Sequence, residues 1–130
     1  MQLCPCGSNI FYAACCGPFL SHHQIPSTPE ALMRSRYTAY FMGNIDYIVE
    51  TMKSPASDRF DPISARERAN KIKWLELNVV NASHDKNTGT VEFYASYADG
   101  QKTRVLHEIS RFILEQGKWF YVSGTYPDDL

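Results

Sequence analysis

The chain has 130 residues, of which 44% are hydrophobic and 21% are charged, and its formal net charge is -1. This length suffices for one domain with a small appendage, and this composition excludes a disordered or fibrous chain. The apolar runs are far shorter than the roughly 20 residues that span a bilayer, so we expect no membrane span. The start, MQLCPCGSN, has neither the basic residue nor the apolar segment of a secretory signal. We therefore expect a cytoplasmic protein.

All four cysteines lie close to the N-terminus in the pattern C-x-C-x8-C-C, at positions Cys4, Cys6, Cys15 and Cys16. Four thiolates at about 2.3 Å from one tetrahedral ion make a closed structural zinc site. We predict one structural Zn2+ here, with no open coordination position for catalysis. Disulfides are one alternative, but a reducing cytosol disfavours them, and a bridge between the two adjacent cysteines would be strained. A catalytic thiol is the other alternative.

The cysteine segment is predicted to form a small module, residues 1–20. It contains no Lys, Arg, Asp or Glu, and the first charged residue of the chain is Glu30. Asn9 favours the cap of a short helical stretch over Ile10–Ala14, which Gly17-Pro18 would end. Two prolines in the polar stretch that follows, 21–29, indicate a linker. We expect one further domain over the remaining residues, 30–130.

Three helices are predicted at the start of this domain. Thr28-Pro29 has the residue types of a helix cap and a first helical position, so a helix should begin here and end at Gly43. Asn44 favours a second helix over about 45–52. Asp61-Pro62 begins a third helix, which is charged and runs to about residue 71 with a solvated face.

The sequence changes to strand patterns from residue 74 onward. Strands are predicted over 74–82, 90–97, 102–115 and 118–123, because runs of apolar and β-branched residues are separated there by turn sequences. In the second strand Val91, Phe93, Ala95 and Tyr97 alternate onto one side. Helices followed by an antiparallel meander favour an α+β fold with the helices packed on one face of the sheet.

Two resemblances to known families add to this interpretation. CPCGSNIFYAACCG resembles the SEC-C zinc module, best known from the C-terminal tail of the SecA translocation ATPase, and every ligand position is filled. ALMRSRYTAY, WLELNV, GTVEFYASY, LHEISRF and GKWFYVSGT resemble, in this order, the YchJ family of uncharacterised bacterial proteins. The resemblance implies a nuclear transport factor 2-like fold, a curved sheet wrapped over helices that encloses a cone. Two departures are that many members carry a second CPCGS-type module after the last strand, and that the family often has Gly in place of Glu76.

Arg36 is anomalous in the first predicted helix. Steps of 100° per residue place Leu32, Met33, Tyr37 and Tyr40 on one apolar face, with Arg36 in its middle. An unpaired buried guanidinium costs several kcal/mol, roughly, so we expect a carboxylate partner from the sheet. Glu108 is preferred to Glu92, because Glu108 shares its strand face with the more apolar set: Leu106, Phe112 and Leu114. Arg36 and Glu108 form either a structural ion pair or an anion site in the cone.

Three classes of function are compatible with these residues. The SEC-C resemblance favours a non-enzymatic adaptor with an unknown protein partner, because in SecA the module is a docking site. By the same association, this resemblance implies a role near protein export or the ribosome. A small-molecule-binding protein or small-pocket enzyme that uses the cone is the alternative. We predict no catalytic residue and no bound organic cofactor, because Glu108 is expected to be committed to Arg36.

His107 has no predicted acid on its side of the strand except the distant Glu115. Nucleic-acid binding ranks last, since the cysteine segment has no basic residue to contact phosphate.

Overall fold

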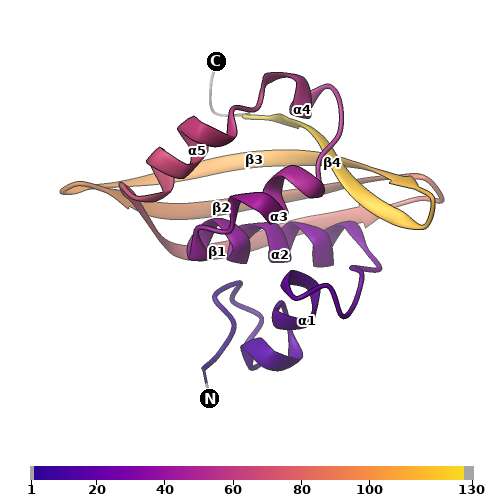
Figure 1. Ribbon diagram of the computed structural model, residues 1–130, viewed down its shortest axis with the longest axis horizontal. Helices are drawn as coiled ribbons and strands as arrows, with labels where there is room; N and C mark the ends of the chain where they lie inside the picture. The colour runs from indigo at the N-terminus through magenta and orange to yellow at the C-terminus, as the bar shows by residue number, and fades with distance from the viewer. Residues whose placement is uncertain (1, 128–130) are drawn as a thin grey trace.

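The computed structural model describes residues 2–127, which form a layer of helices against a four-stranded antiparallel sheet (Figure 1). The strands follow one another in the order β1 (Ile72–His84), β2 (Thr88–Asp99), β3 (Lys102–Glu115) and β4 (Lys118–Thr125). Register shifts interrupt the β1–β2 pairing between Trp74 and Glu76 and the β3–β4 pairing between Arg111 and Phe112. Such bulges bend and twist a sheet. The sheet therefore curves around the helices.

Four helices cover the concave face of this sheet: α2 (Pro29–Met42), α3 (Ile45–Glu50), α4 (Ala56–Arg59) and α5 (Pro62–Ala69) (Figure 1). The predicted caps are confirmed, because side chains of Thr28, Asn44 and Asp61 accept hydrogen bonds from backbone N–H groups in the first turns of α2, α3 and α5. Gly43 ends α2 in a left-handed conformation with φ of 76°. The short helix α4 was not predicted.

The N-terminal segment packs beneath α2 (Figure 1) and contains a 3-10 helix, η1 (Tyr12–Ala14), and a helix, α1 (Gly17–Leu20). Two local predictions are wrong here. Asn9 does not cap a helix but lies in a turn with φ of 65°. Gly17-Pro18 begins α1 instead of ending a helix, because the missing N–H of proline leaves no hydrogen bond unmade in a first turn.

Helix α2 is buried on two sides, one toward the sheet and one toward the cysteine segment. Its described side chains include eight buried residues: Pro29, Leu32, Met33, Ser35, Arg36, Tyr37, Thr38 and Ala39. Three cysteines belong to the same core cluster as the sheet residues Leu77, Val91 and Phe112. The cysteine segment and the domain thus share one core through α2.

The predicted fold class is confirmed: the chain is α+β, with helices packed on a curved antiparallel sheet and a cysteine-rich segment at the N-terminus. No helix within residues 2–127 is long and apolar enough to cross a bilayer. The first residue of the predicted module 1–20 lies outside the described part of the chain. The last three residues of the predicted domain 30–130 also lie outside it.

Candidate functional site

The four cysteine sulfurs form one cluster in which all Sγ atoms lie within 4.8 Å of one another. Gly7, with φ of 81°, and Asn9 turn the chain back after Cys6, and a hydrogen bond of 2.8 Å from the Cys4 N–H to the Ile10 carbonyl closes this turn. Helices η1 and α1 meet at Cys15 and Cys16 and return these two residues to the same point. The cysteines are unpaired thiols, so the disulfide alternative is not what the structure shows.

The sulfur atoms of the cluster lie close enough together to bind one metal ion. Four sulfurs at about 2.3 Å from one ion would lie about 3.8 Å apart, and the Sγ atoms of Cys6 and Cys15 are 3.6 Å apart. A hydrogen bond from Cys16 holds the pKa of the Cys6 thiol well below its usual range and raises the pKa of Cys16. Burial raises the pKa of Cys15 as well, so these interactions favour a thiolate, the form that binds metal, at Cys6 alone. These four residues could hold a metal ion, and His22 and His23 are not part of the cluster.

Polar contacts hold the cysteine cluster against α2. The Arg34 guanidinium donates a hydrogen bond of 2.7 Å to the Cys6 carbonyl and another of 3.0 Å to the Glu30 carboxylate. The Sγ of Cys4 lies 3.7 Å from the hydroxyl of the buried Thr38. One face of α2 is thereby fixed to the cysteine segment, while the opposite face is directed into the concave side of the sheet.

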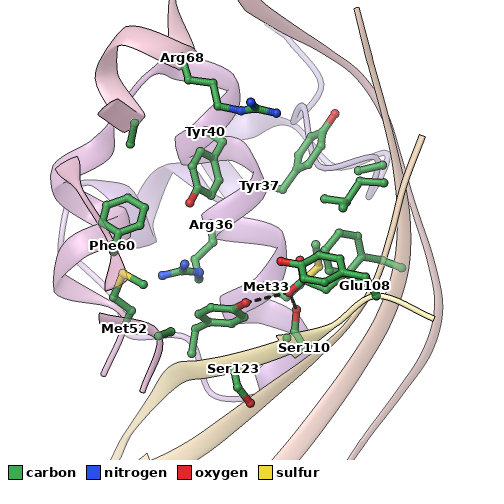
Figure 2. A pocket seen from close by; sticks show the side chains of 18 of the residues that line it. Met33, Arg36, Tyr37, Tyr40, Met52, Phe60, Arg68, Glu108, Ser110 and Ser123 are labelled. Carbon is green, nitrogen blue, oxygen red and sulfur yellow. Dashed lines mark hydrogen bonds between the residues drawn. The ribbon is translucent and has the colours of Figure 1, made fainter. Parts of the chain in front are cut away.

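A cavity of about 1030 Å³ lies between the sheet and helices α2, α4 and α5 (Figure 2). Small-molecule sites in proteins commonly have volumes of about 300–1,000 Å³, so the space is large enough for an organic ligand. Most lining side chains are apolar or aromatic, among them Met33, Tyr40, Met52, Phe60, Trp74 and Phe112. The cone is therefore hollow in its centre.

Arg36 projects from α2 into this cavity, toward the side where Met52 and Phe60 lie (Figure 2). Its Nη1 donates hydrogen bonds of 2.9 Å to the Ile48 carbonyl and 2.7 Å to the Thr51 hydroxyl. Its guanidinium carbon lies 4.6 Å from the centre of the Tyr121 ring. Burial lowers the pKa of Arg36, while nearby tyrosines and Glu108 act in the opposite direction. A guanidinium still stays charged at neutral pH.

Glu108 lies in the same cavity, on β3, and is 7% exposed. Its Oε2 accepts hydrogen bonds of 2.6 Å from the Ser110 hydroxyl and 3.0 Å from the Tyr121 hydroxyl (Figure 2). Gly124 on β4 lies against the same carboxylate, so that a Cβ at this position would collide with it. Burial and the Glu108 carboxylate raise the pKa of Tyr121 and raise that of Tyr126 to about 12. Both hydroxyls therefore stay protonated and can donate to Glu108.

Arg36 and Glu108 line the same cavity, but they do not form an ion pair with each other. Both are 7% exposed, as their positions on apolar faces predict. However, neither Arg36 nor Glu108 forms an ion pair with any described residue. A backbone carbonyl and a hydroxyl replace the expected carboxylate beside Arg36, and two hydroxyls satisfy Glu108.

Other polar residues differ from the sequence-based interpretation. His107 has an acidic partner after all, because its Nε2 lies 2.7 Å from Oε2 of Glu92 on the neighbouring strand, and it stacks on Tyr94. Arg68 is exposed, as the interpretation of this segment as a solvated face predicts, but it and Arg59 also line the cavity. Sequence spacing cannot show that α5 lies across the mouth of the cone. The alternation of Trp119 and Tyr121 on β4 could have identified Tyr121 as an inward residue, and the register shift interrupts this alternation before Ser123.

Fold and site together define a class of protein: a nuclear transport factor 2-like cone preceded by a SEC-C-type cysteine motif. The family description YchJ, middle NTF2-like domain, matches residues 28–124, and the SEC-C motif matches residues 2–18. The chain belongs to this YchJ family.

Related proteins and structures agree with this assignment. A UPF0225 protein of Serratia proteamaculans is 38% identical over 97% of this chain and 84% of its own length. A UPF0225 protein of Vibrio vulnificus is 41% identical over 97% of this chain and 76% of its own length. A SEC-C motif-containing protein from Rhodopseudomonas palustris has a solution structure that is 40% identical in sequence, covers 95% of this chain and 97% of its own, and superimposes with a TM-score of 0.88. A crystal structure from Psychrobacter arcticus is 26% identical, with a TM-score of 0.82, and covers 100% of this chain and 85% of its own.

Proposed function

We propose that the cone of this protein binds a small organic molecule. The observation that carries this proposal is the cavity of about 1030 Å³, which a purely structural adaptor would have no reason to keep open. A buried arginine and a buried glutamate line a largely apolar space, and ligand pockets typically combine a few fixed polar groups with an apolar lining. Glu108, held by two hydroxyl donors, has the role of a positioning group in this proposal.

The cysteine segment is proposed to be a structural zinc module that holds α2 in place. Four cysteines would fill all four positions of a tetrahedral ion, which leaves no open position for chemistry. Arg34 and Thr38 connect the cluster to the helix that carries Arg36, so a bound ion would stabilise one wall of the cavity. Reduced thiols of this kind suit a reducing compartment, and we propose the cytoplasm.

Ligand binding in the cone is tested by nuclear magnetic resonance titration of the labelled protein with a panel of apolar fragments. We expect the largest shifts at cavity residues such as the Trp74 indole N–H. Ala95→Phe should abolish these shifts, because Ala95 is 1% exposed and lines the cavity. Ser96→Phe is the matched control, since Ser96 is the next residue of β2, where successive side chains point to opposite faces. Shifts that persist in Ala95→Phe, or that are absent from cavity residues at millimolar fragment concentrations, contradict the proposal.

Protein docking through the cysteine segment is a second candidate function. Three large apolar side chains, Leu3, Ile10 and Phe11, are 55%, 48% and 46% exposed there, and Leu3 pairs with Phe11 in an antiparallel bridge. An adaptor role, including one near protein export or the ribosome, would use this surface. A photo-reactive residue at position 11 should then crosslink one defined partner in cells, whereas a probe at Val105, which is 64% exposed on β3, should not. Equal crosslinking from both positions argues against a docking site.

A further inference from the structure

Arg36 is a buried cation whose hydrogen-bonding capacity is only partly used. A guanidinium has five N–H donors, and Nη1 supplies both hydrogen bonds that Arg36 makes with the protein. Its Nε and Nη2 donate to no acceptor within residues 2–127. Among the described residues, the Tyr37 hydroxyl is the one side-chain N or O atom that is fully buried and has no hydrogen-bond partner. Because Nε and Nη2 of Arg36 also have no partner, they cannot be fully buried and are accessible from the cavity. The edge of Arg36 formed by Nε and Nη2 is therefore free to bind a ligand.

The side chains that line the cavity carry one more positive than negative charge, with Arg36 and Glu108 buried and Arg59, Asp61 and Arg68 exposed. Its lining contains three arginines, Arg36, Arg59 and Arg68, and two acids, Asp61 and Glu108, which leaves one positive charge in excess. The Asp61 carboxylate is occupied at the start of α5, where it accepts from the Ile63 N–H and the Ser64 hydroxyl. Arg59 and Arg68 form no ion pair with any described residue. This sign is opposite to the net charge of -1 of the whole chain.

We propose that the ligand of the cone is an organic monoanion, a carboxylate attached to an apolar or aromatic body, and that the Nε–Nη2 edge of Arg36 binds its carboxylate. This inference rests on the proposed function of the cone. Two parallel N–H donors on one edge match the two oxygens of a carboxylate. The apolar body would lie against Met52 and Phe60, which flank the guanidinium in Figure 2 and line the cavity. A single excess positive charge fits a monoanion better than a phosphate dianion.

The test compares charged and neutral forms of the same molecule. The probes are a series of arylalkanoates from benzoate to 6-phenylhexanoate, the corresponding neutral amides, and phenyl phosphate. Isothermal titration calorimetry measures affinity, and the Trp74 indole signal shows whether the probe is in the cone. For at least one chain length we expect the acid to bind at least tenfold more tightly than its amide, which corresponds to about 1.4 kcal/mol.

Arginine variants then locate the anion. Arg36→Met should remove the preference for the acid while the affinity for the amide changes little, and Arg36→Lys should retain part of it, because lysine keeps the charge but lacks the two-donor edge. Arg111→Met is the matched control, since Arg111 is an exposed residue of β3 that does not line the cavity. Arg59→Met and Arg68→Met test the mouth of the cavity.

Each outcome decides between distinct alternatives. Equal binding of acid and amide in the cone overturns the anion inference but leaves small-molecule binding in place. Tighter binding of phenyl phosphate, or a preference for the acid that survives Arg36→Met but not the variants at the mouth, also overturns the inference. If no probe binds in the cone at millimolar concentration, both the inference and the proposed function fail. If Arg36→Met does not fold, Arg59→Met and Arg68→Met still decide the question, because these are the other two arginines of the lining: a preference for the acid that survives both changes supports Arg36, and one that is lost in either overturns the inference.

Discussion

The Tyr37 hydroxyl provides a sharp test of the packing on α2. Tyr37 is 5% exposed and its hydroxyl has no hydrogen-bond partner in the described structure. Tyr47 on α3 is equally buried, at 3% exposed, but its hydroxyl lies 2.7 Å from the Ser35 hydroxyl. The same substitution, tyrosine to phenylalanine, therefore removes an unpaired polar group at one position and a hydrogen-bonded one at the other.

The two variants should change stability in opposite directions. A buried polar group without a partner costs about 1–3 kcal/mol, so Tyr37→Phe should raise the free energy of unfolding by up to about 1 kcal/mol after allowance for the small space left behind. Tyr47→Phe removes a hydrogen bond and leaves Ser35 with one partner fewer, so it should lower this free energy by about 1–2 kcal/mol. For a domain of this size a gap of about 2 kcal/mol corresponds to roughly 8 °C in Tm.

Urea unfolding followed by circular dichroism measures both free energies, and equal m-values would show that the unfolded states are comparable. A loss of 1 kcal/mol or more in Tyr37→Phe would refute the reasoning. It would mean that the hydroxyl has a partner in solution, such as a buried water shared with Glu76, whose charge acts on Tyr37.

Three further predictions concern the metal, the sheet and alkaline pH. Purified reduced protein should contain one zinc per chain, and serine replacement of all four cysteines should abolish it; elemental analysis showing metal-free protein with reduced thiols would contradict this. Gly124→Ala should break the Tyr121–Glu108 hydrogen bond, because the new Cβ would lie 2.7 Å from the Tyr121 hydroxyl, and should cost about 1–3 kcal/mol in urea unfolding; unchanged stability would argue against this close packing. Burial raises the pKa of Tyr37 and Tyr47 from 10.0 to about 12, so the stability they contribute is present below pH 10 and is lost as pH rises toward 12. A flat stability profile through this range, measured with tyrosine absorbance as the titration signal, would exclude the expected link.

The elements that the sequence predicts well are those set by local chemistry. Caps at Thr28, Asn44 and Asp61 depend on a side chain and the next few N–H groups, so residue type is enough to place them. The inward faces of β2 and β3 follow from alternation, which correctly selects Glu108 over Glu92 as the buried acid.

The partner of Arg36 could not be predicted in this way. Any backbone carbonyl can accept a hydrogen bond, and the Ile48 carbonyl leaves no trace in the sequence that would distinguish it from others. A carboxylate can be recognised in the sequence as a partner for arginine, whereas a particular backbone carbonyl cannot. The sequence therefore favours Glu108 as the partner of Arg36. That the exposed Arg68 also lines the cavity could not be predicted for a related reason: its position there depends on where α5 packs, which no local pattern encodes.

The double burial of α2 also limits how its length can vary in evolution. Inserting one residue in a helix turns every following side chain by about 100° relative to those before it. An insertion between Arg34 and Arg36 would move Arg36 off the cavity wall and rotate Thr38 away from Cys4, so both contact surfaces would be lost at once. A helix with one solvent-facing side could absorb such a change by shifting its exposed residues. Length changes in this helix should therefore be confined to its ends or to whole turns, and homologous chains should align through it without gaps.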